Sequence, residues 1–407
     1  MKHLIGLAGA CLSAALLTAC GAPGNGVASS VPFSPHSSAT ANRVAEATVW
    51  QLFSFSGKSG ELPYAGLTAL NGTLYGTATA GGDKQLGVVF RITPTGEEKL
   101  LHAFRGGSDG AYPYGSLNDV RGSLYGTTVG GGADGAGTVF KIVPSGSESI
   151  VYNFKGGSDG AGPMARLTEV RGVLYGTTQG GGAHNCGTVF RVTLSGKEAV
   201  LHSFACGRDG ASPEGELANV DGVLYGTTYG IQAKGNDGTV FKITTEGAET
   251  VLHRFKGGPS DGANPASGLV NDGGTLYGTT LLGGNGCYSG GGECGTVYKI
   301  TTTGAETVIH AFSGGYQDGA NPYASLANID GELYGTTESG YDGCYYNYGC
   351  GVVFKITTSG IETIVASFGN GGGTNPESHV TNVNGTLYGT ASKGGAANTG
   401  TVYAISP

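Results

Sequence analysis

Short runs of alternating apolar and polar residues, separated by turn residues, recur along the chain. The pattern is clear between 113 and 154, where four runs rich in β-branched and aromatic residues cover 114–120, 123–129, 137–143 and 148–154. Arg121-Gly122 separates the first two runs, and glycine-rich or Pro-Ser-Gly segments separate the others. Alternation with a period of two predicts strands, and the short turns predict that they pair as a four-stranded antiparallel meander.

This unit occurs seven times. The Leu-Tyr-Gly-Thr string of the second run places its tyrosine at Tyr75, Tyr125, Tyr175, Tyr225, Tyr277, Tyr334 and Tyr388. The third run carries an aromatic residue at Phe90, Phe140, Phe190, Phe241, Tyr298, Phe354 and Tyr403. Several copies place Asn-Gly or Asp-Gly between the first two runs, which suits the positive φ angles of a type I′ hairpin. Four strands in about 50 residues are typical of a propeller blade, and too long for one coil of a β-helix.

The two ends of the repeat region are complementary. The fourth run ends in a phenylalanine six times, at Phe104, Phe154, Phe204, Phe255, Phe312 and Phe368. The last unit stops at Ile405, after its third run, and the missing fourth run stands at the start as 48–55. We therefore predict an all-β protein, a seven-bladed propeller over 48–407, whose N-terminal strand completes the last blade and removes an open sheet edge.

The first residues are typical of an export sequence. Lys2 precedes an apolar run that is too short to span a bilayer, which predicts a lipoprotein-type signal peptide over 1–19. The string Leu-Thr-Ala-Cys that ends at Cys20 resembles the bacterial lipoprotein box, which implies lipidation of Cys20, with Gly21 favouring the outer membrane. The alternative is an ordinary signal peptide and a secreted protein. Residues 20–47, rich in Ser, Ala, Pro and Gly, predict a flexible tether.

Composition excludes several classes of protein. Glycine supplies 80 of 407 residues and charged residues only 13%, which excludes a mainly helical protein. The net charge of −8 and the lack of a basic stripe argue against a nucleic-acid partner. We expect contact with a membrane only through the lipid anchor, no cofactor, and a monomer.

The repeated strings LYGTT, GTVFKIT and DGAxP are similar to those of the GloVer-type tandem-repeat proteins of bacteria. The Gly-Gly pair after the second run resembles kelch blades more loosely. The first resemblance implies a β-propeller that is exported with one of several kinds of anchor. It implies no activity.

Six cysteines remain after Cys11 and Cys20, in a compartment that we expect to be oxidising. The predicted hairpin around Gly196 places Cys186 opposite Cys206. Two further pairs each flank one loop, at Cys287 and Cys294 and at Cys344 and Cys350. We predict three local disulfides, with free thiols as the alternative. The cysteine spacing is not that of a metal site.

The loops between the second and third strands and between successive blades share one face of a propeller, the loop face. A Gly-Gly-Ser-Asp-Gly-Ala motif or its variants repeats there, with aspartates at Asp109, Asp159, Asp209, Asp261 and Asp318. We expect these carboxylates to accept backbone N–H bonds in a turn, with calcium or carbohydrate binding as the alternative. Histidines recur at one position of the fourth run, which suggests structural roles, at His102, His202, His253 and His310. His184 and His379 match no other copy.

Two loops interrupt the repeat and carry aromatic residues. They supply a candidate ligand face at Tyr288, Tyr341, Asp342, Tyr345, Tyr346, Asn347 and Tyr348. Insertions on a scaffold's loop face often carry recognition, and tyrosine offers a large contact area at low entropic cost. The alternative is that disulfides merely order two long loops.

Three functional hypotheses remain open. The first is a non-catalytic module that binds a glycan or protein at the cell surface. The second is a polysaccharide lyase or hydrolase that acts on the loop face, although no catalytic motif occurs and no acidic pair breaks the repeat. The third is an architectural envelope protein. Converging acids with a shifted pKa would favour the enzyme, an aromatic surface would favour binding, and a face of small residues would favour architecture.

Overall fold

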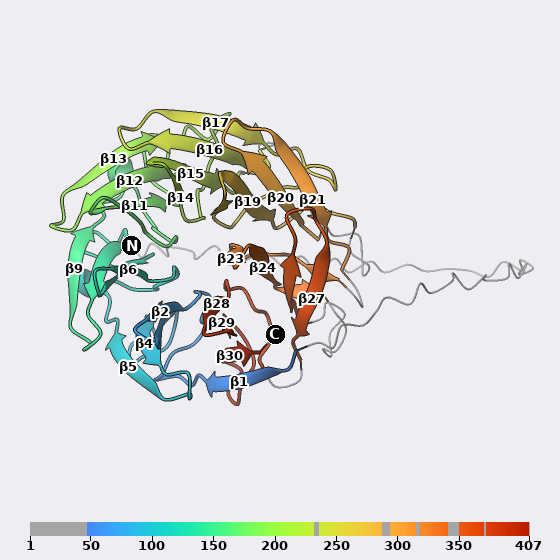
Figure 1. The fold of residues 1–407 in the computed structure, drawn as a ribbon. Coiled ribbons are helices and arrows are strands. Elements are labelled where there is room, and N and C mark those ends of the chain that lie inside the picture. The colour runs from blue at the N-terminus through green and yellow to red at the C-terminus, as the bar shows by residue number, and fades with distance from the viewer. Residues whose placement is uncertain are drawn as a thin grey trace, which may run out of the picture. The chain divides into compact units, whose positions relative to one another are not determined.

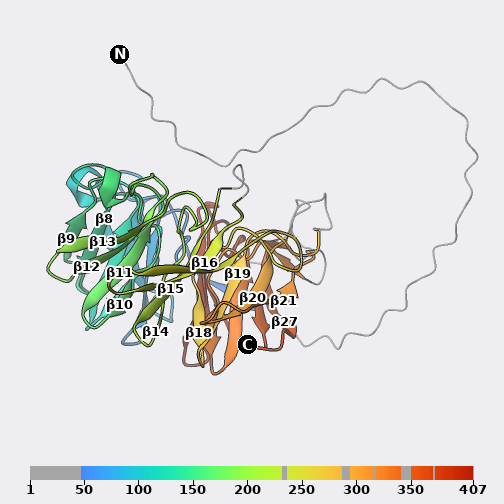
Figure 2. The same ribbon diagram turned by 90° about the horizontal axis from the view of Figure 1, so that it is seen from above.

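Seven four-stranded antiparallel sheets follow one another around a ring (Figure 1). The computed structural model describes residues 47–231, 236–286, 294–314, 318–340, 350–369 and 372–406. Figure 2, turned by 90°, shows the blades standing side by side around the ring. The predicted seven-bladed propeller is confirmed. Residues 1–46, which include the predicted signal peptide, Cys20 and nearly all of the tether, lie outside the described residues.

Each blade contributes four strands, numbered here from the ring axis outward. The first strands are β2 (Thr68–Leu70), β6 (Asn118–Val120), β10 (Thr168–Val170), β14 (Ala218–Val220), β18 (Val270–Asp272), β23 (Ala327–Ile329) and β28 (Thr381–Val383). The second strands are β3 (Thr73–Ala78), β7 (Ser123–Thr128), β11 (Val173–Thr178), β15 (Val223–Thr228), β19 (Thr275–Thr280), β24 (Glu332–Thr337) and β29 (Thr386–Ala391).

The third and outer strands complete each sheet. The third strands are β4 (Val88–Ile92), β8 (Thr138–Ile142), β12 (Thr188–Thr193), β16 (Thr239–Thr244), β20 (Thr296–Thr301), β26 (Val352–Ile356) and β30 (Thr401–Ile405). The outer strands are β5 (Glu98–Ala103), β9 (Glu148–Asn153), β13 (Glu198–Ser203), β17 (Glu249–Arg254), β21 (Glu306–Ala311), β27 (Glu362–Ser367) and β1 (Val49–Ser54). Four short elements lie between blades, namely η1 (Gly107–Asp109), η2 (Gly157–Asp159), β22 (Gly319–Ala320) and β25 (Ser339–Gly340).

The N-terminal strand closes the ring as predicted. β1 pairs antiparallel with β30, with Val49 opposite Ile405 and Ser54 opposite Thr401. The last blade is therefore built from both ends of the repeat region, in the order β1-β30-β29-β28. In the other six blades a hairpin connects the third strand to the outer strand. β1 and β30 have no such connection, so hydrogen bonds and packing alone hold β1 in the last blade.

The first strands are shorter than the sequence pattern predicts. The run 114–120 contributes only Asn118–Val120 to the sheet. The preceding segment leaves the sheet to line the ring axis, where a Cβ on Gly115 would lie 2.6 Å from the carbonyl oxygen of Met164 in the next blade. The predicted hairpin turn is present, because Arg121 and Gly122 have φ angles of 55° and 80°.

Aromatic pairs form the core between blades. The phenylalanine that follows each outer strand is packed edge-on against the third-strand aromatic residue of the next blade, as Phe104 is on Phe140 at 5.3 Å between ring centroids. The same contact joins Phe55 to Phe90 across the ring closure, at 5.0 Å. Both rings of each of these pairs are buried. The glycine of the Leu-Tyr-Gly-Thr string accommodates this ring, since a Cβ on Gly126 would lie 2.5 Å from Phe140.

A ladder of threonines fixes the segments that line the axis. The Thr of each Leu-Tyr-Gly-Thr string donates its hydroxyl to a carbonyl of the axial segment in the next blade, as Thr77 does to Gly115 at 3.2 Å. The equivalent donors are Thr127, Thr177, Thr227, Thr279, Thr336 and Thr390. Thr390 reaches Ala65 at 2.8 Å and so carries the ladder through the ring closure. The backbone at the axis is therefore held in the same way in all seven blades.

A disulfide joins Cys186 to Cys206, with their Cα atoms 5.3 Å apart, as the hairpin register predicts. Cys294 and Cys350 are also disulfide-bonded. The partners predicted for them, Cys287 and Cys344, lie outside the described residues. Within the described part of the chain, no helix has the length and apolar character needed to cross a membrane.

Candidate functional site

The seven axial segments line an open cavity of about 90 Å³ at the ring axis. Each segment follows the proline of its DGAxP-like string and precedes the first strand of its blade. The first lining residue of each segment is Tyr64, Tyr114, Met164, Glu214, Ala266, Tyr323 or Glu377. The third is Gly66, Ser116, Arg166, Glu216, Gly268, Ser325 or His379. The backbone repeats while these side chains differ, so a symmetric ring encloses an asymmetric site.

Three tyrosines from the first, second and sixth blades contact one another at the cavity. The rings of Tyr64 and Tyr114 are stacked, with centroids 4.9 Å apart and an interplanar angle of 21°. A side-chain hydrogen bond joins Tyr114 to Tyr323, which belongs to the sixth blade. Burial raises the pKa of all three hydroxyls, so they stay neutral over the physiological range. The cluster offers neutral aromatic surface and phenolic hydroxyl groups to the cavity.

Carboxyl groups from the fourth, sixth and seventh blades lie near this cluster. Glu377 accepts a hydrogen bond of 3.0 Å from Ser392, and burial, assisted by the nearby charge of Glu338, raises its pKa to about 7. Glu214 accepts a hydrogen bond of 2.7 Å from Gln179, and burial raises its pKa as well. Burial also raises the pKa of Glu338, against the opposing charge of Lys393. These carboxyl groups are converging acids with shifted pKa values.

A second polar layer lies further along the axial segments. Arg166 Nη1 is 3.9 Å from Glu216 Oε2, and its Nη2 donates to Asn118 at 3.3 Å. His379 is half-buried, and desolvation lowers its pKa against the opposing charge of Glu216. The imidazole packs against Gly66, where a Cβ would lie 2.3 Å from the ring. Within this layer, Glu216 balances the positive charge of Arg166. The layer therefore differs from the part of the cavity lined by Glu214 and Glu377, where carboxyl groups predominate.

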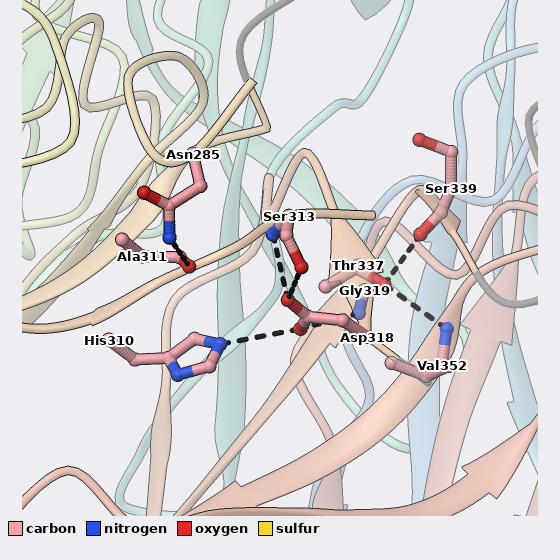
Figure 3. A network of polar contacts seen from close by, with 9 residues as sticks. All are labelled: Asn285, His310, Ala311, Ser313, Asp318, Gly319, Thr337, Ser339 and Val352. Carbon is pink, nitrogen blue, oxygen red and sulfur yellow. Dashed lines mark hydrogen bonds and ion pairs between the residues drawn. The ribbon is translucent and has the colours of Figure 1, made fainter. Parts of the chain in front are cut away.

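The predicted loop aspartates lie at the outer part of the blade boundaries, away from this cavity. Asp318 is typical, as Figure 3 shows: Oδ2 accepts from the backbone N and the hydroxyl of Ser313 at 2.7 and 2.8 Å, and Oδ1 lies 3.3 Å from His310 Nε2. The other four also accept a backbone N–H, and they are Asp109, Asp159, Asp209 and Asp261. These carboxylates close a turn.

The recurring histidines face the same aspartates. The Nε2 atoms of His102, His202 and His253 lie 3.1, 3.4 and 2.6 Å from Asp109, Asp209 and Asp261. Of the five boundaries that carry the aspartate, one has a tyrosine in place of the histidine, and there the Tyr152 hydroxyl donates to Asp159 at 2.8 Å. The phenol of Tyr152 thus takes the place of the imidazole. This indicates that Tyr152 and the recurring histidines all serve to fix the position of the aspartate.

A glutamate from the next blade adds to each of these pairs. Burial, assisted by the neighbouring aspartate, raises the pKa of the glutamate to about 7 in each case, at Glu148, Glu198, Glu249, Glu306 and Glu362. Two of the boundaries bring all three ligand atoms within 4.8 Å of one another, as a metal site would, at His102, Asp109 and Glu148 and at His253, Asp261 and Glu306. Their recurrence around the ring fits a shared structural role.

The aromatic candidate ligand face cannot be compared with the cavity, because Tyr288 and residues 341–349 lie outside the described residues. No acidic pair was expected to break the repeat, yet two acids at the axis depart from it. Glu214 and Glu377 stand where other blades have Tyr, Met or Ala. The sequence carries an indication of this site, namely the variable position directly after the conserved proline. It becomes a cluster only when the ring brings seven such positions to one axis.

Comparison with solved structures shows similarity to larger proteins. A puromycin-hydrolyzing peptidase from Mycobacterium tuberculosis is 11% identical with a TM-score of 0.52, over 88% of this chain and 55% of the other. A puromycin hydrolase mutant complexed with PGG is 14% identical with a TM-score of 0.50, over 82% and 50%. The chain thus spans about half the length of these two proteins, and the likeness shows the fold alone.

Sequence comparison identifies the family. None of the curated proteins matches the chain. The profile of the Gloeobacter/Verrucomicrobia repeat, in contrast, matches residues 87–291 and 286–407, which together cover most of the propeller and include the repeated strings that fix its blade register. The chain belongs to the Gloeobacter/Verrucomicrobia repeat family.

Proposed function

We propose that this protein is a non-catalytic binding module that recognises a glycan at the cavity on the ring axis. The observation that carries the proposal is the asymmetry of that cavity. Seven identically held backbone segments present stacked tyrosines from some blades and carboxyl groups from others. A wall that only lined the axis would need neither tyrosines nor carboxyl groups, since the fifth blade lines it with the small residues Ala266 and Gly268.

The chemistry of the wall suits a sugar. The aromatic faces of Tyr64 and Tyr114 can pack against the apolar face of a pyranose ring, and the phenolic hydroxyls add polar contacts. Glu214 and Glu377 can accept hydrogen bonds from sugar hydroxyls in a partly dry site, where such bonds are strong. A few placed polar groups in a concave, partly aromatic wall are the usual features of a small-ligand site.

The size of the cavity limits how much of a glycan can enter. A volume of about 90 Å³ is well below the roughly 300–1,000 Å³ of pockets that hold a whole small molecule. This is enough for the end of a chain or one substituent of a sugar, and too little for two whole sugar rings. We therefore expect recognition of a chain end, with the rest of the glycan lying on the loop face.

We also propose that the module acts outside the cell, attached to the outer membrane through Cys20. The Cys186–Cys206 disulfide is compatible with an oxidising compartment, and so is the absence of a membrane-crossing helix from the described residues. Mass spectrometry of the mature N-terminus tests the anchor. An unmodified peptide that begins at another residue than Cys20 would refute it.

A glycan array followed by calorimetry on the soluble chain from Thr48 onward tests the binding function. We expect one class of glycan to bind, and the double variant Tyr64→Ala with Tyr114→Ala to lose that binding while keeping its melting temperature within a few degrees. Trp50→Ala is the matched control, because Trp50 is an exposed aromatic residue on the outer strand β1. Binding that survives the double variant would place the site elsewhere.

The second candidate function is hydrolysis or elimination on a polysaccharide. The pKa of about 7 for Glu377, beside Glu338, favours it, because a protonated and an ionised carboxyl group are the usual pair for glycoside cleavage. The small cavity argues against it, since the sugars on both sides of a scissile bond would have to fit. Release of reducing ends or of unsaturated products, abolished by Glu377→Gln, would make this the function instead.

A further inference from the structure

Glu214 and Glu377 line the cavity, Glu338 lies close to Glu377, and these carboxyl groups outnumber the basic groups near them. Glu214, Glu338 and Glu377 come from three different blades, and Lys393 is the basic side chain whose charge lowers the pKa of Glu338 and Glu377. Arg166 does not serve these groups, because it contacts Glu216 and Asn118 in the second polar layer. Among the described residues, the carboxyl groups thus lack a full set of counter-charges.

Burying a carboxylate without a counter-charge is costly, so the group takes up a proton or binds a cation. The raised pKa of Glu377 reflects the tendency to take up a proton. A bound cation would serve equally well and would leave the carboxyl group ionised. The site therefore favours ligands that carry a positive charge over neutral ligands of the same shape.

The tyrosines strengthen this preference. A cation near the face of a neutral aromatic ring is attracted by the ring quadrupole, more so when both are withdrawn from water. Tyr64 and Tyr114 stack on each other near Glu377, whose charge acts on both hydroxyls, and these hydroxyls stay protonated because burial raises their pKa. A cavity of about 90 Å³ is far smaller than the usual pocket for a whole ligand of roughly 300–1,000 Å³, which favours entry of one small substituent such as an ammonium group.

We infer that the cavity selects glycans that carry a free, protonated amino group, that is, amino sugars without an acyl group on the nitrogen. This inference rests on the proposed glycan-binding function. The ammonium group enters between the tyrosine cluster and Glu377, and the sugar ring that bears it lies at the mouth of the cavity.

Binding is then coupled to proton release. When the ammonium group enters, the proton on Glu377 leaves for the buffer, and the carboxylate pairs with the ligand. Affinity falls as the pH drops below the range in which Glu377 titrates, because the carboxyl group keeps its proton. Affinity also falls at high pH, because the amine loses its own proton. An optimum between these two limits follows.

Calorimetry with two oligosaccharides of the same backbone tests the inference, namely a glucosamine tetramer and the corresponding N-acetylglucosamine tetramer, whose amides are neutral. At pH 7 we expect the amine form to bind about tenfold more tightly. Its binding heat should also differ between phosphate and Tris buffers, because a released proton is taken up with different heats. The acetylated form should show no such buffer dependence.

Two variants complete the design. Glu377→Gln imitates the protonated carboxyl group, so it should abolish both the proton release and most of the preference for the amine. Glu97→Gln removes an exposed carboxylate in a turn and should leave both unchanged. Equal affinity for the two tetramers, or a preference that survives Glu377→Gln, would overturn the inference and leave glycan binding intact. Failure of every glycan to bind would overturn the proposed function as well.

Discussion

Replacement of Phe55 by alanine tests how firmly the ring is closed. The Phe55 ring is 1% exposed and packs edge-on against Phe53 and Phe90, at 5.2 and 5.0 Å between centroids. Truncation of a buried phenylalanine costs about 3–5 kcal/mol, through lost burial and the cavity left behind. At about 2.1 cal/mol/K of unfolding entropy per residue, this loss lowers the melting temperature of a ring of roughly 360 residues by about 4–7 °C.

Phe154→Ala supplies the matched control. Phe154 makes the same edge-on contact with Phe190, at 4.9 Å, at a boundary between two blades that are continuous in the chain. Differential scanning calorimetry and urea unfolding should give both variants a similar loss. Phe55→Ala should in addition become sensitive to proteolysis near the start of β1, because no hairpin connects β1 to its blade. A near-zero effect of Phe55→Ala beside a normal effect of Phe154→Ala would show that the closure contributes no stability.

Three other predictions concern stability. Cys186→Ser with Cys206→Ser should cost about 3 kcal/mol in urea unfolding, from the entropy of a loop with a sequence separation of 20, and a reducing agent should then have no further effect at this site. The five glutamates at the blade boundaries have a pKa of about 7 in the folded state, above the unfolded value of 4.5. Their protonated forms therefore stabilise the fold at low pH, and this stabilisation is lost as the pH rises from about 4.5 through 7. Replacing all five by glutamine should flatten the fall of the melting temperature between pH 5.5 and 8, and a wild-type melting temperature that rises over this interval would contradict the reasoning. Gly126→Ala should cost about 1–3 kcal/mol or more in urea unfolding, because the new Cβ would lie 2.5 Å from Phe140. Gly207→Ala is the control, because its Cβ would lie 3.9 Å from the nearest atom at a residue without positive φ, and an equal cost there would contradict the steric reasoning.

The fold could be predicted in detail because its determinants repeat. Seven copies of one string fix the blade number, and the fourth run at 48–55 fixes how the ring closes. The length of the first strands could not be predicted in this way. Tyr114 continues the alternating pattern, yet its backbone leaves the sheet because the axis brings the neighbouring blade within contact distance of Gly115. The neighbouring blade limits the length of the first strand, and the sequence of a single repeat unit does not reveal this limit.

The candidate site was missed for a related reason. Repeat analysis gives weight to residues that recur, such as Asp109 and His102, and these hold turns together. Glu214 and Glu377 do not recur, so each looks like ordinary variation within its own unit. Their importance depends on distance across the axis, between residues that are 163 positions apart in the sequence, 377 minus 214. Variation at a position that the scaffold holds fixed is a better guide to function here than repetition.

The threonine ladder separates the part of each unit that maintains the ring from the part that faces the axis. Because the hydroxyl of Thr127 contacts a main-chain carbonyl, it is indifferent to the side chain that its neighbour presents. A lineage can therefore exchange tyrosine, glutamate or alanine in one unit without adjusting the other six. Specificity can then change through single substitutions, and an engineer could combine lining residues from different units to prepare receptors for other small groups on an unaltered frame.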